Sequence, residues 1–122
     1  MIDFKNSVVF KLKKASEAPA ELDQLLIAGE EVIGSYKTIR DFVIFTNKRI
    51  IALNVQGFTG TKKDFTTLPY SKIQVFSVET AGLLDMDSEL ELYFSGLGKV
   101  KFEFTGQSDI IQIGKIISQH VL

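Results

Sequence analysis

The run Asp41-Phe-Val-Ile-Phe-Thr-Asn-Lys-Arg-Ile-Ile-Ala-Leu53 carries the strongest structural signal in this chain. Two stretches rich in aromatic and β-branched residues flank Asn47-Lys48, and this pattern predicts a β-hairpin. A hairpin with one face in water alternates apolar with polar residues. Here both faces are apolar, so the second face must lie against another layer of the protein, a partner subunit or a ligand.

Strand alternation divides the side chains of this hairpin into two sets, because successive residues of a strand point to opposite faces. Phe42, Ile44, Ile51 and Leu53 form one set. The other set consists of Val43, Phe45, Ile50 and Ala52. We expect the rest of the chain to cover one face and the other to contact a second subunit. The sequence does not decide which face is which, and we take the second set as the candidate oligomer interface.

Composition sets broad limits on the chain. With 122 residues, 45% of them hydrophobic, it is expected to form a single domain over 1–122. The net charge of −1 gives no reason to expect nucleic-acid binding. There is no cysteine, which excludes disulfides, thiol catalysis and cysteine-based zinc sites. We recognise neither a signal peptide nor an apolar run of membrane-spanning length, so we expect a cytoplasmic protein.

The segment before residue 29 is predicted to be a helical extension. Phe4, Val8 and Leu12 recur every four residues, as on one face of a terminal helix. Two alternatives stay open for 1–15: a basic amphipathic segment that touches a membrane, and a short strand or arm. A second helix of about ten residues is expected between Ser16 and Gly29, starting near a proline and ending at a glycine.

The remainder, 29–122, alternates with the period of strands and then ends in a helix. After Gly29, strands are predicted at 31–38, at the two arms of the hairpin, and at 62–68, 72–80, 89–94 and 99–105. Ser108-Asp109 is expected to cap a C-terminal helix that carries Ile113 and Ile117 on its apolar face. The predicted fold is therefore mainly β: a seven-stranded, two-sheet barrel or sandwich with a C-terminal helix closing one open end.

Catalytic and metal-binding chemistry find little support in the sequence. The one histidine, His120, lies in the last predicted helical turn, where a structural role is expected. Asp85, Asp87 and Glu89 have the spacing of a calcium loop, but Leu90 occupies the position of the loop glycine. We expect no catalytic residue, no metal site and no cofactor. Asp41 is expected to pair with a neighbouring arginine or a backbone amide.

Two basic turns could contact an anion. One follows the centre of the hairpin and the other follows a glycine-rich turn. The four candidate residues are Lys48, Arg49, Lys62 and Lys63. A solvated turn is the simpler interpretation of each, and contact with an anionic headgroup or an acidic partner is the alternative.

Several fragments, in this order, resemble the bacterial pleckstrin-homology (PH) domain family. They are Leu26 to Glu31, Ser35-Tyr-Lys-Thr-Ile-Arg-Asp41, Ile44-Phe-Thr-Asn-Lys-Arg-Ile-Ile51, Gln56-Gly57, Gly60-Thr-Lys-Lys63, Pro69-Tyr-Ser-Lys-Ile73, Ser77-Val-Glu-Thr-Ala-Gly82 and Asp85-Met-Asp-Ser-Glu-Leu90. The resemblance implies a seven-stranded two-sheet barrel with a C-terminal helix, and homo-oligomeric rings. It does not extend to a phosphoinositide site, because Lys37-Thr-Ile-Arg40 lacks the basic pattern that such a site uses.

The sequence therefore predicts a non-enzymatic interaction or scaffold module that self-associates into a homo-oligomer. A peripheral domain that binds an anionic lipid or another anionic ligand through the basic turns is the alternative. The identity of a further protein partner is left open.

Overall fold

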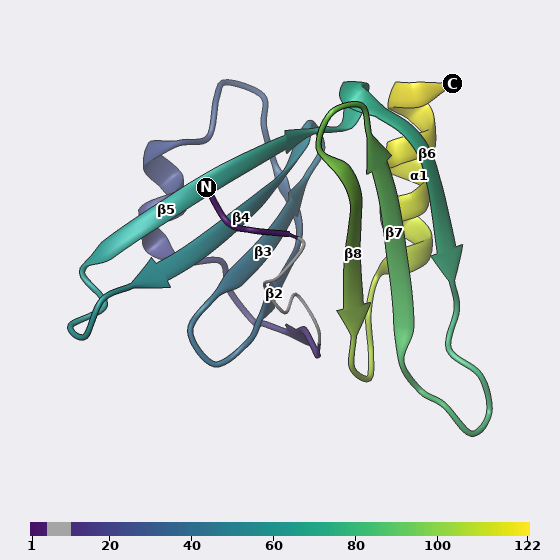
Figure 1. Ribbon diagram of the computed structural model, residues 1–122, viewed down its shortest axis with the longest axis horizontal. Helices are drawn as coiled ribbons and strands as arrows, with labels where there is room; N and C mark the ends of the chain where they lie inside the picture. Colours follow the sequence, from purple (N-terminus) through teal and green to yellow (C-terminus); the bar gives the residue numbers. More distant parts are fainter. Residues whose placement is uncertain (5–10) are drawn as a thin grey trace.

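The computed structural model describes residues 1–4 and 11–122, and its strands form two antiparallel sheets (Figure 1). The larger sheet has the order β1-β2-β3-β4-β5, with strands Lys13–Lys14, Val32–Lys37, Phe42–Thr46, Arg49–Gln56 and Lys62–Pro69. The smaller has the order β6-β7-β8, with strands Ile73–Glu79, Ser88–Phe94 and Gly98–Phe104. Helix α1 (Ile110–Val121) follows, and the described residues also form the 3-10 helices η1 (Ala20–Gln24) and η2 (Tyr70–Lys72).

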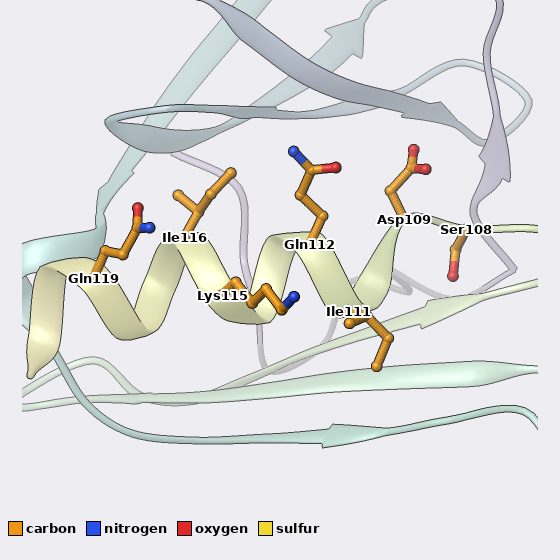
Figure 2. A pocket seen from close by; sticks show the side chains of 7 residues that line it. All are labelled: Ser108, Asp109, Ile111, Gln112, Lys115, Ile116 and Gln119. Atoms are coloured by element: carbon orange, nitrogen blue, oxygen red, sulfur yellow. The ribbon is translucent and has the colours of Figure 1, made fainter.

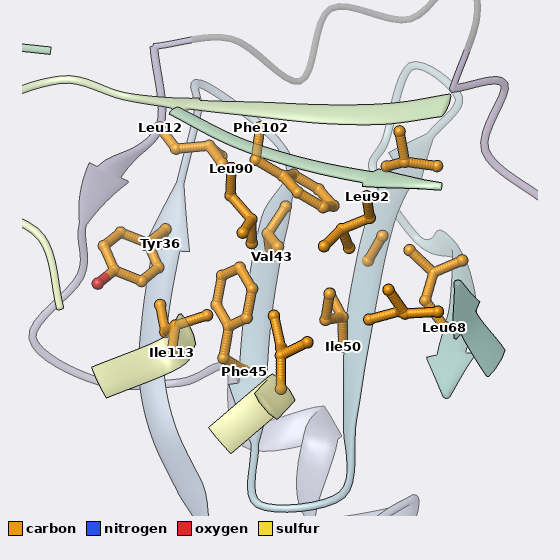
Figure 3. Close-up of a cluster of buried hydrophobic side chains, with 14 of the residues drawn as sticks. Leu12, Tyr36, Val43, Phe45, Ile50, Leu68, Leu90, Leu92, Phe102 and Ile113 are labelled. Atoms are coloured by element: carbon orange, nitrogen blue, oxygen red, sulfur yellow. The ribbon is translucent and has the colours of Figure 1, made fainter. Parts of the chain in front are cut away.

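The predicted hairpin is formed by β3 and β4, and its two side-chain sets are confirmed. Phe45 pairs with Ile50 and Val43 pairs with Ala52 across the hairpin, which places these four side chains on one face. That face packs against β7, β8 and α1 in the main core (Figure 3).

The candidate oligomer interface is therefore corrected by the structure. Val43, Phe45, Ile50 and Ala52 are at most 1% exposed within a single chain. They form the contact between the two sheets, so no surface of these side chains is left for a partner subunit. Two twisted sheets that pack face to face need large apolar side chains between them, and this set provides them.

The opposite face of the hairpin is also covered by the same chain. Ile44 and Ile51 pack against Leu22, which lies in η1. The partly buried residues packed against this small cluster are Ala18, Leu26, Phe42 and Phe65. The layer that covers the outer face of the larger sheet is thus the segment just before β2. Both apolar faces of the hairpin are buried without a second molecule.

The helix predicted between Ser16 and Gly29 is not formed, and only the 3-10 turn η1 is present. Polar side chains form hydrogen bonds with backbone groups that would pair with each other in a helix. Arg49 Nη2 donates to the carbonyl of Leu25 at 2.7 Å, and the amide of Ile27 donates to Glu30 Oε1 at 3.2 Å. A short helix has little stability of its own, so such side-chain hydrogen bonds compete effectively with helix formation.

The described part of the N-terminal segment is extended rather than helical. Leu12 donates its amide to Glu103 O and accepts the amide of Thr105, both at 2.9 Å, which joins it to β8. The next two residues form β1 beside β2. Leu12 and Phe4 are buried in the main core, which leaves neither side chain free for a membrane surface. Val8 of the predicted stripe lies outside the described residues.

The remaining strands and α1 follow the predicted pattern closely. In β7 and β8 the apolar side chains point inward and the charged ones outward, as the alternation indicated. Helix α1 approaches β6 closely, because a Cβ built at Gly114 would lie 3.1 Å from Val78 Cγ2. A side chain at this position would require Val78 to shift by a few tenths of an ångström.

Asp109 occupies the N-cap position of α1, but its carboxylate does not cap the helix as predicted. Asp109 Oδ2 accepts the hydroxyl of Tyr36 at 3.3 Å and the ammonium of Lys14 at 3.0 Å, while its amide donates to the same hydroxyl at 2.8 Å. Burial, followed by the nearby Asp109 carboxylate, raises the pKa of Tyr36 to about 12. This contact ties the start of α1 to the larger sheet.

Candidate interaction surfaces

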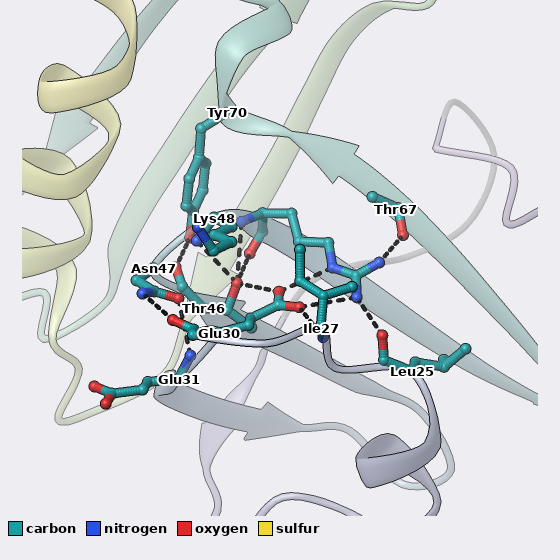
Figure 4. Close-up of polar contacts among 11 residues, drawn as sticks. Leu25, Ile27, Glu30, Glu31, Thr46, Asn47, Lys48, Thr67 and Tyr70 are labelled. Atoms are coloured by element: carbon teal, nitrogen blue, oxygen red, sulfur yellow. Dashed lines mark hydrogen bonds and ion pairs between the residues drawn. The ribbon is translucent and has the colours of Figure 1, made fainter.

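A buried ion pair lies at the end of the hairpin where β3 turns into β4 (Figure 4). Arg49 donates to both carboxylate oxygens of Glu30, from Nε to Oε2 at 2.9 Å and from Nη2 to Oε1 at 3.0 Å. The Glu30 side chain is fully buried. Thr46 donates its hydroxyl to the same carboxylate at 2.7 Å. A bidentate pair of this kind fixes both side chains and favours the ionised form of the carboxylate.

The pKa of Glu30 reports how these contacts combine. Burial alone would raise it, but the hydrogen bonds from Arg49, Thr46 and the Ile27 amide outweigh burial and lower it from 4.5 to about 2. The carboxylate is therefore ionised and satisfied at neutral pH. The role of the pair is structural, because it holds the segment before β2 against the hairpin.

The four candidate anion contacts do not form one site. Lys48 and Arg49 lie at the β3–β4 turn, whereas Lys62 and Lys63 follow the turn at the other end of β4. Eight residues of strand separate the two turns by roughly 25 Å. Arg49 is held by Glu30, and Lys63 donates to Glu21 at 2.9 Å. Of these four residues, Lys48 and Lys62 have no ion pair with the part of the chain that the structure describes.

A different basic surface appears at the loops that follow β2 and β4. Ile39 and Phe58 are both fully exposed at the tips of these loops. Arg40 Nη2 donates to the carbonyl of Gly57 at 2.6 Å, which holds the loops side by side. We call Ile39, Arg40, Phe58 and Lys62 the loop-tip surface. Sequence reasoning missed it, because isolated apolar residues in turns carry no periodic signal.

Asp41, beside this surface, has the structural role that was predicted. Its Oδ1 accepts the amide of Val55 at 3.0 Å, and its Oδ2 accepts Asn54 Nδ2 at 3.2 Å. The partner is thus a backbone amide rather than an arginine. These bonds pin the β2–β3 loop to β4 and so help to position Ile39 and Arg40.

The connection between β6 and β7, residues 80–87, projects beyond the end of the smaller sheet (Figure 1). We call it the arm. The Gly82 amide donates to Asp85 O at 2.7 Å, and the Asp87 amide donates to Asp85 Oδ1 at 3.0 Å, so the tip is a closed turn. Leu83 and Leu84 occupy that tip and are fully exposed.

The outer face of the smaller sheet carries a shallow groove of about 370 Å³. Val75, Tyr93 and Lys99 are aligned across the three strands in register, with Ser77 and Glu91 in the adjacent row. We call these five residues the outer groove. Val75 is 66% exposed and Tyr93 49% exposed, which leaves an apolar strip open to solvent.

An acidic row crosses the same face nearer the arm. Glu79 pairs with Glu89 in register, and Glu89 pairs with Glu103. A hydrogen bond with Glu89, together with the negative charge of Glu89, raises the pKa of Glu79. Among residues 1–4 and 11–122, these carboxylates do not form a group that could hold a metal ion. Of the residues with calcium-loop spacing, Asp85 and Asp87 lie in the connection between β6 and β7, and Glu89 lies in β7.

A polar groove of about 550 Å³ runs along α1 (Figure 2). Asp109, Gln112 and Ile116 point to one side of the helix in this view, and Lys115 and Gln119 complete its polar lining. His120 lies just beyond, where its Nδ1 is 2.9 Å from the carbonyl of Ile116 and its ring centre is 5.2 Å from that of Tyr70. In the described ranges no Ser–His or carboxylate pair with catalytic geometry lines this groove.

The two-sheet architecture with its closing helix agrees with a match to the bacterial PH domain family model over residues 3–121. The chain belongs to the bacterial PH domain family. A DUF1696 family protein with a PH domain from Shewanella loihica is a structural neighbour, with a TM-score of 0.74 and 36% identity over 93% of this chain and 99% of that one.

This bacterial PH domain also resembles two Bacillus subtilis proteins that are named as uncharacterised. YjqA is 43% identical over 100 residues, which is 80% of each chain. YozO is 31% identical over 113 residues, which is 93% of this chain and 96% of YozO. Nothing in the described residues or in these relatives points to catalysis. No helix in the described ranges has the length and apolar character needed to cross a bilayer.

Proposed function

We propose that this bacterial PH domain is a non-enzymatic interaction module that assembles with copies of itself. The observation that carries the proposal is the exposed apolar surface on the smaller sheet, which consists of Val75 and Tyr93 on its outer face and Leu83, Leu84 and Met86 in the arm. These residues form two apolar patches, separated by the acidic row of Glu79, Glu89 and Glu103. Exposed apolar patches on a folded chain are typical of interaction sites.

The energetic argument rests on the arm. Each leucine at its tip gains about 1.5–3 kcal/mol when it leaves water for apolar surroundings. The closed turn already fixes the backbone that presents them. Binding therefore costs little additional backbone entropy at the tip, and burial of the leucines offsets part of the translational and rotational cost of association.

The mass of the assembly tests this proposal. Size-exclusion chromatography with light scattering at tens of micromolar should give a multiple of the mass of one chain. Leu84→Asp should lower that mass, because a charge replaces an apolar contact. Ile39→Asp is the matched control, since Ile39 is equally exposed but lies on another surface, and it should leave the mass unchanged. A wild-type protein that elutes as a monomer would refute the proposal.

The loop-tip surface supports a second candidate function, peripheral binding to an anionic membrane. Two exposed apolar tips beside Arg40 and Lys62 fit a bilayer interface, where apolar side chains enter the acyl boundary and cations meet anionic headgroups. This set replaces the one predicted from the sequence, since Arg49 and Lys63 are engaged in ion pairs.

Vesicle co-sedimentation distinguishes this function from self-association. Vesicles that contain phosphatidylserine should pellet the protein, and Phe58→Asp should abolish binding while the assembled mass stays unchanged. Leu84→Asp should lower the assembled mass and leave vesicle binding unchanged. Binding should weaken with added salt, because exposed charges are screened. Equal recovery of Phe58→Asp and the wild type in the pellet would rule out the loop-tip surface.

A further inference from the structure

We infer that the phosphates of an anionic bilayer bind against Lys13 and Lys37, beside the loop tips. We call Lys13, Lys37 and Arg40 the basic strip. The inference rests on the membrane binding proposed for the loop-tip surface, and it adds the residues of β1 and β2 that contact the headgroups. It follows from two like charges held opposite each other, from their distance to the apolar tips, and from the charge around them.

Lys13 and Lys37 are directly opposite each other in the antiparallel pair of β1 and β2. Side chains at such positions lie on the same face of the sheet, about 5 Å apart at Cβ, and like charges in this arrangement destabilise the pair. Both lysines are exposed, and neither has an ion pair with the part of the chain that the structure describes. An anion bound against the two ammonium groups would remove this repulsion.

The residues on either side of Lys13 hold it in this position. Leu12 is fully buried, and two backbone hydrogen bonds of 2.9 Å join it to β8 and to the residue that follows β8. Lys14 Nζ is 3.0 Å from Asp109 Oδ2. These contacts fix β1 in spite of the like charges, so the two cations are in place before a ligand binds. Such preorganisation lowers the entropic cost of binding.

The loop tips lie at the right distance from the basic strip for a bilayer. Ile39 is fully exposed and follows Lys37 by two residues, a distance of at most about 7 Å. Apolar surface of a peripheral protein enters the boundary between headgroups and acyl chains by about 5–10 Å. When Ile39 and Phe58 enter this boundary, Lys37 therefore lies among the phosphates. Arg40 lies there too, and Nη2 alone of its nitrogens donates to the described residues, namely to the carbonyl of Gly57.

The charge at this end of the larger sheet is positive. Asp41 accepts the amide of Val55 at 3.0 Å, which directs its carboxylate to β4. Glu21 is paired with Lys63, and Lys62 adds a fourth unpaired cation. Positive charge beside two fully exposed apolar tips complements an anionic bilayer. An acidic protein would complement the cations alone and would leave the apolar tips in water.

Substitutions at position 13 separate binding from stability. Lys13→Gln should weaken binding to phosphatidylserine vesicles about fivefold and Lys13→Glu about 30-fold, because one charge near a membrane surface is equivalent to about 1 kcal/mol. Both should raise the midpoint of thermal unfolding by roughly 1–4 °C, since the repulsion from Lys37 is removed. A lysine with a purely structural role would show no loss of binding when its substitution stabilises the fold.

Lys48→Glu is the matched control. It makes the same change of charge at an exposed position at the opposite end of β4, and it should leave vesicle binding unchanged. Phe58→Asp reports on the loop-tip surface independently of the basic strip. If Phe58→Asp abolishes binding but Lys13→Glu and Lys48→Glu bind alike, the basic strip is overturned and membrane binding survives.

The remaining outcomes are also decisive. A lowered unfolding midpoint in both variants at position 13 would mark Lys13 as structural and overturn the inference. A wild type that does not bind vesicles overturns both the inference and the membrane function. If that wild type binds soluble polyglutamate instead, the basic strip belongs to an acidic protein partner.

Discussion

Phe45→Ala is expected to destabilise the protein by about 3–5 kcal/mol, the usual cost of removing a buried phenylalanine ring. Phe45 is fully buried, and its ring centre lies 5.8 Å from Tyr36 and 6.0 Å from both Phe102 and Phe104. Truncation leaves a cavity between the two sheets and removes three aromatic contacts. Urea unfolding followed by circular dichroism measures the loss.

Phe58→Ala is the matched control, because the same chemical change is made at a fully exposed position. Its effect should stay within about 0.5 kcal/mol. Since small domains have only about 5–15 kcal/mol of stability, Phe45→Asp should leave no folded protein. A folded Phe45→Asp monomer would show that this face lies at a surface, as the sequence had suggested.

Arg49→Met is expected to cost about 3–5 kcal/mol at neutral pH, because it leaves the Glu30 carboxylate buried without its cation. Lys63→Met is the control. It breaks the Lys63–Glu21 pair, in which both side chains are partly exposed, and should cost less than about 1 kcal/mol. Glu30→Leu/Arg49→Met should regain most of the lost stability, since no charge is then left unpaired. Equal effects of Arg49→Met and Lys63→Met would contradict the structural role of Glu30.

The pH dependence of the wild type follows from the same pair. The pKa of Glu30 is lowered from 4.5 in the unfolded chain to about 2 in the fold. A lowered carboxylate pKa contributes stability that is fully present above pH 4.5 and is lost as the pH falls towards 2. The shift corresponds to about 3 kcal/mol. The difference between the wild type and Arg49→Met should therefore shrink between pH 5 and pH 2, which urea unfolding across this range would measure.

The two faces of the hairpin were predicted correctly from the sequence. Alternation placed Phe45 with Ile50 and Ile44 with Ile51, and the register confirms both assignments. The strands after residue 30 and the C-terminal helix were also found within one or two residues. These features are local, since they depend on the period of side chains along one element.

The errors have a shared cause. The segment 16–29 was assigned as a helix because its leucines are spaced for one. In the structure Arg49 binds the carbonyl of Leu25, and Leu22 is the residue of this segment that is buried against the larger sheet. The Glu30–Arg49 pair was missed because 19 residues separate its members. Nothing in a linear pattern reports which distant polar groups will satisfy each other.

The sequence alone determined the strand pattern, the two apolar faces of the hairpin and the family resemblance, because each depends on residues near one another in the chain. The tertiary structure alone decided what covers each face. It placed Val43 and Phe45 against the second sheet, and Ile44 and Ile51 beneath η1. A strand is equally able to pack against a subunit or a neighbouring segment, so its covering layer depends on how the whole chain folds back. That layer is the chain itself, and exposed apolar side chains lie elsewhere, among them those of the arm, the outer groove and the loop tips.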